Sequence, residues 1–175
     1  VLVLVLPILF TIDGILDIWL KAVPEYTAIF CRLILVYFSI EAITAPLWMS
    51  VQATGKIRNY QILMASLIFL NFPIAYIVLK LGLPVYSIWI VRIMVNLVVM
   101  IARCIYMKKK LNFPLLPYIK AVIMPIVSVT LVALPIPILL YYTIHGFWQN
   151  MIIVGIITFA LTVVDVYFVG MNTHE

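Results

Sequence analysis

Charged residues are scarce in this chain, and their scarcity excludes an ordinary soluble domain. Only 10% of the 175 residues are charged, whereas 67% are hydrophobic and the mean hydropathy is +1.26. A soluble domain of this length needs polar residues to cover its surface, and this sequence has too few of them. The composition therefore indicates a protein whose surroundings are mostly apolar.

Long apolar runs take the place of the missing polar residues. A helix needs about 20 apolar residues to cross the hydrocarbon core of a bilayer. Because backbone groups in lipid must pair within their own segment, runs of this kind form helices. We therefore predict an all-α fold, a polytopic bundle of transmembrane helices. About six spans are expected, at residues 1–20, 27–52, 60–79, 85–107, 118–142 and 147–170.

Positive charge alternates between the loops that join these spans. Segments 53–59 and 103–120 carry two and five Lys or Arg residues, whereas 21–25, 80–84 and 143–146 are balanced or weakly charged. The positive-inside rule places the first two segments and the C-terminus in the cytoplasm and the other three outside. This pattern predicts a multi-pass protein with membrane lipids as neighbours. Since the net charge of +5 is concentrated beside spans, nucleic acid is not expected as a partner.

Proline is frequent inside the predicted spans, where it removes a backbone donor and tends to kink the helix. Bent helices suit a protein that changes shape around a cavity, but proline is also more frequent in transmembrane helices in general. Both interpretations apply to prolines such as Pro46, Pro73, Pro125, Pro135 and Pro137.

Two charged residues lie inside the span at 27–52. Glu41 is near its middle and Arg32 is nearer its outer end. Nine residues separate them, about 180° around a helix, so they cannot pair with each other. A charge at membrane depth is costly and usually lines a cavity. We expect Glu41 to face a cavity or a cation on another span, whereas Arg32 either snorkels to the interface or joins the cavity.

A basic stripe is predicted along the span at 85–107. Arg92 lies near mid-membrane, Asn96 follows one turn later on the same face, and Arg103 continues that face toward the cytoplasm. A guanidinium binds phosphate through a planar fork, which suits an anionic substrate. The alternative is that Arg92 neutralises Glu41 on a neighbouring helix, and the two hypotheses can coexist.

Three aspartates are candidates for ion coupling. Asp13 and Asp17 lie one turn apart near the outer end of the first span, where two like charges can share a proton. The alternative is two interfacial carboxylates in water. Asp165 forms a polar stripe with Thr158 and Thr162 on the last span, which helix packing explains as well as a pathway does.

Motifs of enzymes and metal sites are missing from the sequence. The run Thr54-Gly55-Lys56 is not a P-loop, because Ser50 stands where that motif needs glycine. Cys31 and Cys104 are predicted near opposite membrane faces, and no metal-ligand spacing exists. We expect no enzymatic activity, no cofactor, no metal and no disulfide within the chain.

Four segments resemble a known family by their order and spacing. They are Ala53–Gln61 (ATGKIRNYQ), Leu70–Tyr76 (LNFPIAY), Leu79–Pro84 (LKLGLP) and Leu16–Leu20 (LDIWL). The succession resembles the C-terminal half of bacterial polysaccharide (O-antigen type) flippases, in the multidrug/oligosaccharidyl-lipid/polysaccharide exporter superfamily. The resemblance covers most of residues 1–110, and the last two spans match in hydropathy alone.

The resemblance implies a function and partners. Residues 1–175 would form a MATE-like C-terminal bundle, with an N-terminal helix bundle absent from this chain. The family flips undecaprenyl-pyrophosphate-linked oligosaccharides across the bacterial cytoplasmic membrane by alternating access, beside glycan polymerase and ligase machinery. Arg32, Glu41, Arg92 and Asn96 are then candidates to line its substrate cavity. The alternatives are a drug or cation antiporter of the same superfamily and a non-transporting membrane subunit of a glycan-assembly complex.

Overall fold

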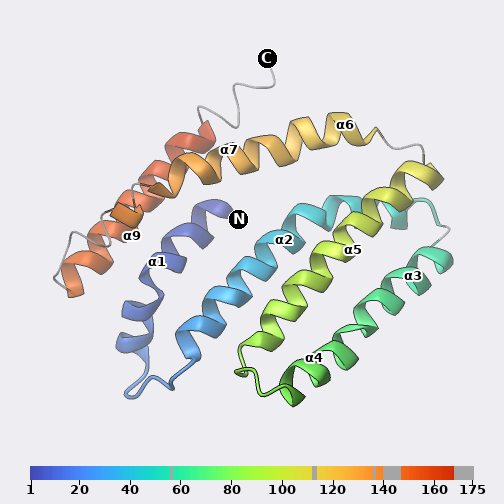
Figure 1. Cartoon of the computed structure of the whole chain (residues 1–175). Coiled ribbons are helices and arrows are strands. Elements are labelled where there is room, and N and C mark those ends of the chain that lie inside the picture. Colours follow the sequence, from blue (N-terminus) through green and yellow to red (C-terminus); the bar gives the residue numbers. More distant parts are fainter. Residues whose placement is uncertain (56, 112–113, 136, 140–146, 168–175) are drawn as a thin grey trace. The chain divides into compact units, whose positions relative to one another are not determined.

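The computed structural model describes residues 1–55, 57–111, 114–135, 137–139 and 147–167, and every regular element in these ranges is a helix (Figure 1). This confirms the predicted all-α class. Five helical runs of the described residues are long and apolar enough to cross a membrane, by length and composition. They cover Leu2–Trp19, Thr27–Ala53, Arg58–Lys80, Ser87–Lys110 and Leu116–Leu139.

The first four runs agree with the predicted spans to within a few residues. They contain α1 (Leu2–Trp19), α2 (Thr27–Ala53), α3 (Arg58–Phe69) with α4 (Asn71–Lys80), and α5 (Ser87–Leu111). Hydrophobicity alone set these boundaries, because each run must match the thickness of the bilayer core.

The last two predicted spans agree less fully with the structure. The fifth run contains α6 (Leu115–Tyr118), the π-helix η1 (Ile119–Ile123) and α7 (Met124–Ala133). The sixth predicted span corresponds to α9 (Phe147–Asp165), whose apolar part, Ile152–Asp165, is shorter than the five runs. Residues 140–146 and 168–170, which the predicted spans and loop include, lie outside the described residues.

Two of the interior prolines coincide with irregular helix geometry. The third run is interrupted at Leu70, between α3 and α4, three residues before Pro73. Proline has no N–H for the carbonyl four residues earlier, here that of Phe69, so the regular ladder cannot continue. The π-helix η1 ends directly before Met124 and Pro125, a position where helices often relieve the same strain.

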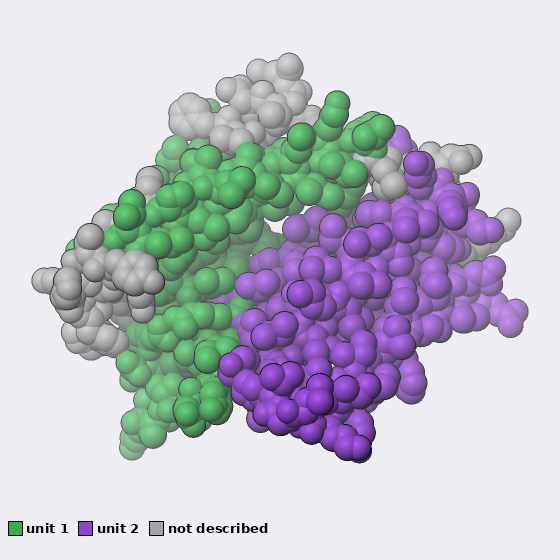
Figure 2. All heavy atoms as spheres, in the orientation of Figure 1, with its two compact units in different colours: residues 1–32, 116–175 green, residues 33–115 purple. Residues whose placement is uncertain are grey.

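The chain folds as two compact units, which Figure 2 colours separately. In the first unit, residues 1–32 and 116–175, α1 packs along α9 and α7 packs against α9. In the second unit, residues 33–115, α3 and α4 both pack against α5.

Small and hydroxylated residues let α1 and α9 approach closely. A Cβ added at Gly155 would lie 3.4 Å from Cγ2 of Thr11 on α1. Thr158 and Thr162 are fully buried, and their hydroxyls donate to Val154 and Thr158 carbonyls of their own helix. Interfaces between membrane helices are typically built this way. Helix packing therefore accounts for the threonine stripe of the last predicted span.

Glycines form two turns within the segments that carry the resemblance. Gly55, after α2, has φ +69°, and Gly82, after α4, has φ +77°. Glycine enters this left-handed region without the steric cost that a Cβ brings. Both turns therefore depend on glycine, and neither position suits a labelling cysteine.

The predicted topology can be tested next to these turns. In a chain whose Cys31 and Cys104 are replaced by serine, we place single cysteines at Asn59 and Leu81, which are both exposed. A membrane-impermeant thiol reagent should label Asn59→Cys only from the cytoplasm and Leu81→Cys only from outside, because the basic loop stays inside. Labelling of Asn59→Cys from outside would reverse the assignment.

Candidate functional site

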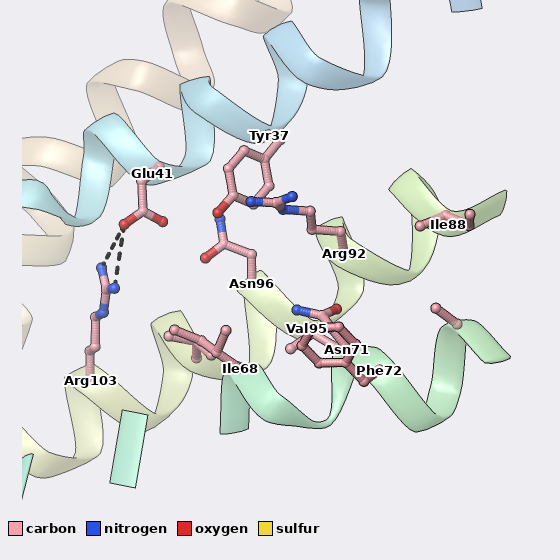
Figure 3. Close-up of a pocket in the computed structure, with 12 residues that line it drawn as sticks. Tyr37, Glu41, Ile68, Asn71, Phe72, Ile88, Arg92, Val95, Asn96 and Arg103 are labelled. Carbon is pink, nitrogen blue, oxygen red and sulfur yellow. Dashed lines mark hydrogen bonds and ion pairs between the residues drawn. The ribbon is translucent and has the colours of Figure 1, made fainter. Parts of the chain in front are cut away.

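A cavity of about 390 Å³ lies within the second unit, among α2, α3, α4 and α5 (Figure 3). Half of the residues that line it are apolar, as expected inside a bundle of membrane helices. The other half is polar or charged, and it is formed by Tyr37, Glu41, Asn71, Arg92, Asn96 and Arg103. This combination makes the cavity the strongest candidate site among the described residues.

The predicted stripe on α5 forms one wall of this cavity. Arg92, Asn96, Val99 and Arg103 all line it, at spacings of three or four residues that keep them on one helix face. Asn96 and Arg103 are each only 7% exposed. Three of the polar residues that helical periodicity selected therefore share one cavity.

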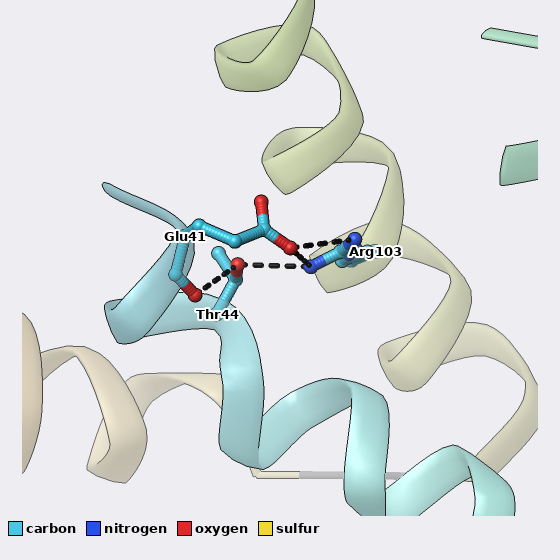
Figure 4. Close-up of polar contacts among 3 residues, drawn as sticks. All are labelled: Glu41, Thr44 and Arg103. Atoms are coloured by element: carbon cyan, nitrogen blue, oxygen red, sulfur yellow. Dashed lines mark hydrogen bonds and ion pairs between the residues drawn. The ribbon is translucent and has the colours of Figure 1, made fainter. Parts of the chain in front are cut away.

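Glu41 on α2 pairs with Arg103 on α5 (Figure 4). Both terminal nitrogens of Arg103 donate to Oε1 of Glu41 at 3.3 Å, and Nη1 also donates to the Thr44 hydroxyl at 2.9 Å. The Arg103 side chain is 9% exposed and that of Glu41 36%. The predicted cation on another span is confirmed, but the alternative that Arg92 neutralises Glu41 is wrong.

Arg92 contacts aromatic rings rather than a carboxylate. Its guanidinium carbon lies 4.9 Å from the ring centroid of Tyr37 and 5.0 Å from that of Trp89. Such cation–π contacts hold a guanidinium in place without neutralising it. The guanidinium of Arg92 forms no ion pair or hydrogen bond with any residue that the structure describes. Arg92 is therefore a cation at the cavity that no acidic side chain of the described residues neutralises.

Several polar atoms at or beside the cavity have no hydrogen-bond partner in the described part of the chain. Those on cavity-lining residues are Nδ2 of Asn96, Oδ1 of Asn71 and Nε of Arg103. Asn71 was not among the predicted site residues. The sequence pattern that could have indicated Asn71 is an asparagine two residues before Pro73 inside an apolar run. A helix interrupted there can turn a polar side chain toward the protein interior.

Arg32 is not among the residues that line this cavity. Arg32 donates to Oδ2 of Asp13 on α1 at 2.5 Å, and its Nε lies 3.4 Å from the Leu9 carbonyl. Asp17 is exposed. Asp13 thus has a cationic partner. The hypothesis that Asp13 and Asp17 share a proton did not include this partner. Their role in ion coupling stays a prediction.

Asp165 on α9 is half-buried, and its Oδ2 has no partner among the described residues. Its role in ion coupling also stays a prediction. Within the described ranges, no three His, Cys, Asp or Glu side chains are grouped as metal ligands, and Cys31 and Cys104 are both free thiols.

Comparisons of the chain with protein families, curated proteins and solved structures found no match. The function is therefore inferred from the residues of the cavity.

Proposed function

We propose that this chain is part of a membrane transporter for an anionic lipid-linked oligosaccharide, of the undecaprenyl-pyrophosphate type, in the bacterial cytoplasmic membrane. The observation that carries the proposal is the uncompensated Arg92 on the wall of a cavity between long apolar helices. Arg92 lies five residues after Ser87, where α5 begins, so it is nearer the start of α5 than the mid-membrane position predicted from the sequence. A charge between apolar helices is still costly unless it serves a ligand or a pathway.

The charge balance of the cavity favours an anion. Two guanidinium groups line it against one carboxylate, and Glu41 is already paired with Arg103. Arg92 remains for a ligand, and its planar fork fits two phosphate oxygens at once. A diphosphate head group would meet this cation with its sugar on the polar wall and its chain in the surrounding lipid.

Transport then needs more than one conformation of the cavity. We propose a MATE-like C-terminal bundle that works with an N-terminal bundle by alternating access, with the C-terminus in the cytoplasm. Asp13, Asp17 and Asp165 remain candidates for ion coupling, and Arg32 for a second cationic contact. Glycan polymerase and ligase machinery would be the natural neighbours, because they consume a flipped lipid-linked glycan.

The substrate class is tested by equilibrium binding with the purified chain in nanodiscs. We expect saturable binding of radiolabelled undecaprenyl pyrophosphate that weakens as salt concentration rises, because screening reduces attraction between the cation and the diphosphate. The neutral alcohol undecaprenol is the matched control and should bind at least about tenfold more weakly. Saturable binding of tetraphenylphosphonium without binding of the diphosphate would instead support a cation antiporter.

A further inference from the structure

Two amide side chains in the cavity each have one buried atom without a hydrogen-bond partner in the described part of the chain. Asn96 on α5 is 7% exposed, and its Nδ2 donor has no acceptor among the described residues. Oδ1 of Asn71, at the start of α4, is a buried acceptor without a donor there. A buried donor or acceptor that stays unpaired costs stability, so its retention needs a reason.

The position of Asn71 follows from the interrupted helix. Leu70 separates α3 from α4, and Asn71 is the first residue of α4. Figure 3 shows Asn71 and Asn96 on different helices that face the same cavity, together with Arg92. The unpaired acceptor and the unpaired donor therefore both belong to one binding surface.

The chemistry of the two atoms restricts the ligand. Ionised phosphate only accepts hydrogen bonds, so it can pair with Asn96 or Arg92 but leaves Oδ1 of Asn71 unpaired. A hydroxyl group both donates and accepts, and a sugar ring carries several hydroxyls. A ligand that satisfies the whole polar wall therefore needs hydroxyl groups as well as negative charge.

We propose that Asn71 and Asn96 form a hydroxyl-binding subsite for the carbohydrate part of the ligand, beside the anion-binding Arg92. The proposal rests on the proposed function and adds to it the residues that read the sugar. The diphosphate contacts the guanidinium, and the first sugar contacts the two amides. Ordered water occupies the amides when the sugar is absent.

Two lipids that differ only in the sugar test the subsite. The probes are undecaprenyl pyrophosphate and the same lipid carrying one N-acetylglucosamine, measured by equilibrium binding to the whole chain in nanodiscs. The wild-type chain should prefer the glycosylated lipid. Asn71→Leu and Asn96→Leu should each weaken its binding about threefold to tenfold, as expected for one lost neutral hydrogen bond. Binding of the bare lipid should change by less than about twofold.

Matched variants separate this subsite from the anion site and from folding. Arg92→Gln should weaken the binding of both lipids. Ser39 donates its hydroxyl to the Leu35 carbonyl of its own helix, so Ser39→Ala should weaken the binding of neither. Leucine removes an unpaired amide at similar volume, so the melting temperature should not fall. Asn71→Ala and Asn96→Ala replace the leucine variants if those fail to fold.

The outcomes distinguish the two proposals. An unchanged ratio of the two dissociation constants in the Asn variants would overturn the subsite and leave the amides as water ligands only. In that case, weaker binding of both lipids by Arg92→Gln would still support the proposed function. If the wild-type chain binds neither lipid, both proposals fail.

Discussion

Replacing Glu41 with glutamine is expected to destabilise the protein by about 2–3 kcal/mol. The Arg103 side chain is 9% exposed, and Glu41 supplies both of its ionic contacts. Glutamine keeps an amide oxygen that can accept from Arg103 beside the Thr44 hydroxyl, but it carries no charge, so the buried guanidinium loses its counter-charge. The expected loss of unfolding free energy is smaller than that for a fully buried ion pair, because the Glu41 side chain is 36% exposed. Thermal unfolding in detergent measures the change.

Two comparisons identify the ion pair as the cause. Glu25→Gln changes the same functional group in an exposed loop and should leave the melting temperature nearly unchanged. Arg103→Met combined with Glu41→Gln should recover most of the stability, because no unpaired charge then remains in the apolar interior. Equal and small effects of Glu41→Gln and Glu25→Gln would contradict a structural role for the pair.

Replacing Arg92 with alanine is expected to abolish surface glycan while the protein remains in the membrane. A hydrogen bond to a charged group contributes about 1.5–3 kcal/mol, which is about 10- to 100-fold in affinity. Arg92→Lys keeps the charge but loses the planar fork that grips a diphosphate, so we expect an intermediate loss. Surface glycan is measured on cells that lack their own copy, beside the amount of protein in the membrane fraction.

Arg58→Ala is the matched control for this series. Arg58 is exposed at the start of α3 and does not line the cavity. Its replacement should leave glycan export intact. Normal export by Arg92→Ala would make the residue structural, and loss of the protein from the membrane would show that Arg92 acts through folding.

The helices could be predicted from the sequence because a bilayer demands long apolar runs. The bounds of α2 and α5 follow from hydropathy, since apolar residues dominate both helices despite the few charged and polar residues inside them. The break at Leu70 was predictable only as a kink caused by Pro73. The inward position of Asn71 depends on how α4 packs against α5, which hydropathy does not describe.

The wall of the cavity was predictable, but its ion pairs were not. Helical periodicity places Arg92, Asn96 and Arg103 on one face whatever lies opposite. The partner of Glu41 depends on how far along its helix each residue lies. These positions can be read from the sequence, and they distinguish the two candidate arginines. Glu41 lies 14 residues after Thr27, the start of α2, whereas Arg103 and Arg92 lie 16 and 5 residues after Ser87, the start of α5. Comparable depth favours Arg103.

The pair between Arg32 and Asp13 had a similar signal. Asp13 lies six residues before Trp19, the end of α1, and Arg32 lies five residues after Thr27, where α2 begins. Two consecutive helices joined by a short loop bring such positions to one depth. The hypothesis that Asp13 shares a proton with Asp17 on the same helix did not include this ion pair with Arg32.

Photo-crosslinking tests most directly whether the cavity binds an anionic lipid head group. The probe is undecaprenyl pyrophosphate with a diazirine beside the diphosphate, applied to the chain in nanodiscs. We predict labelling concentrated in residues 37–41 and 92–103, suppressed by excess unlabelled lipid and lost in Arg92→Ala. Equal labelling of lipid-exposed helix faces, without competition and without dependence on Arg92, would contradict the account.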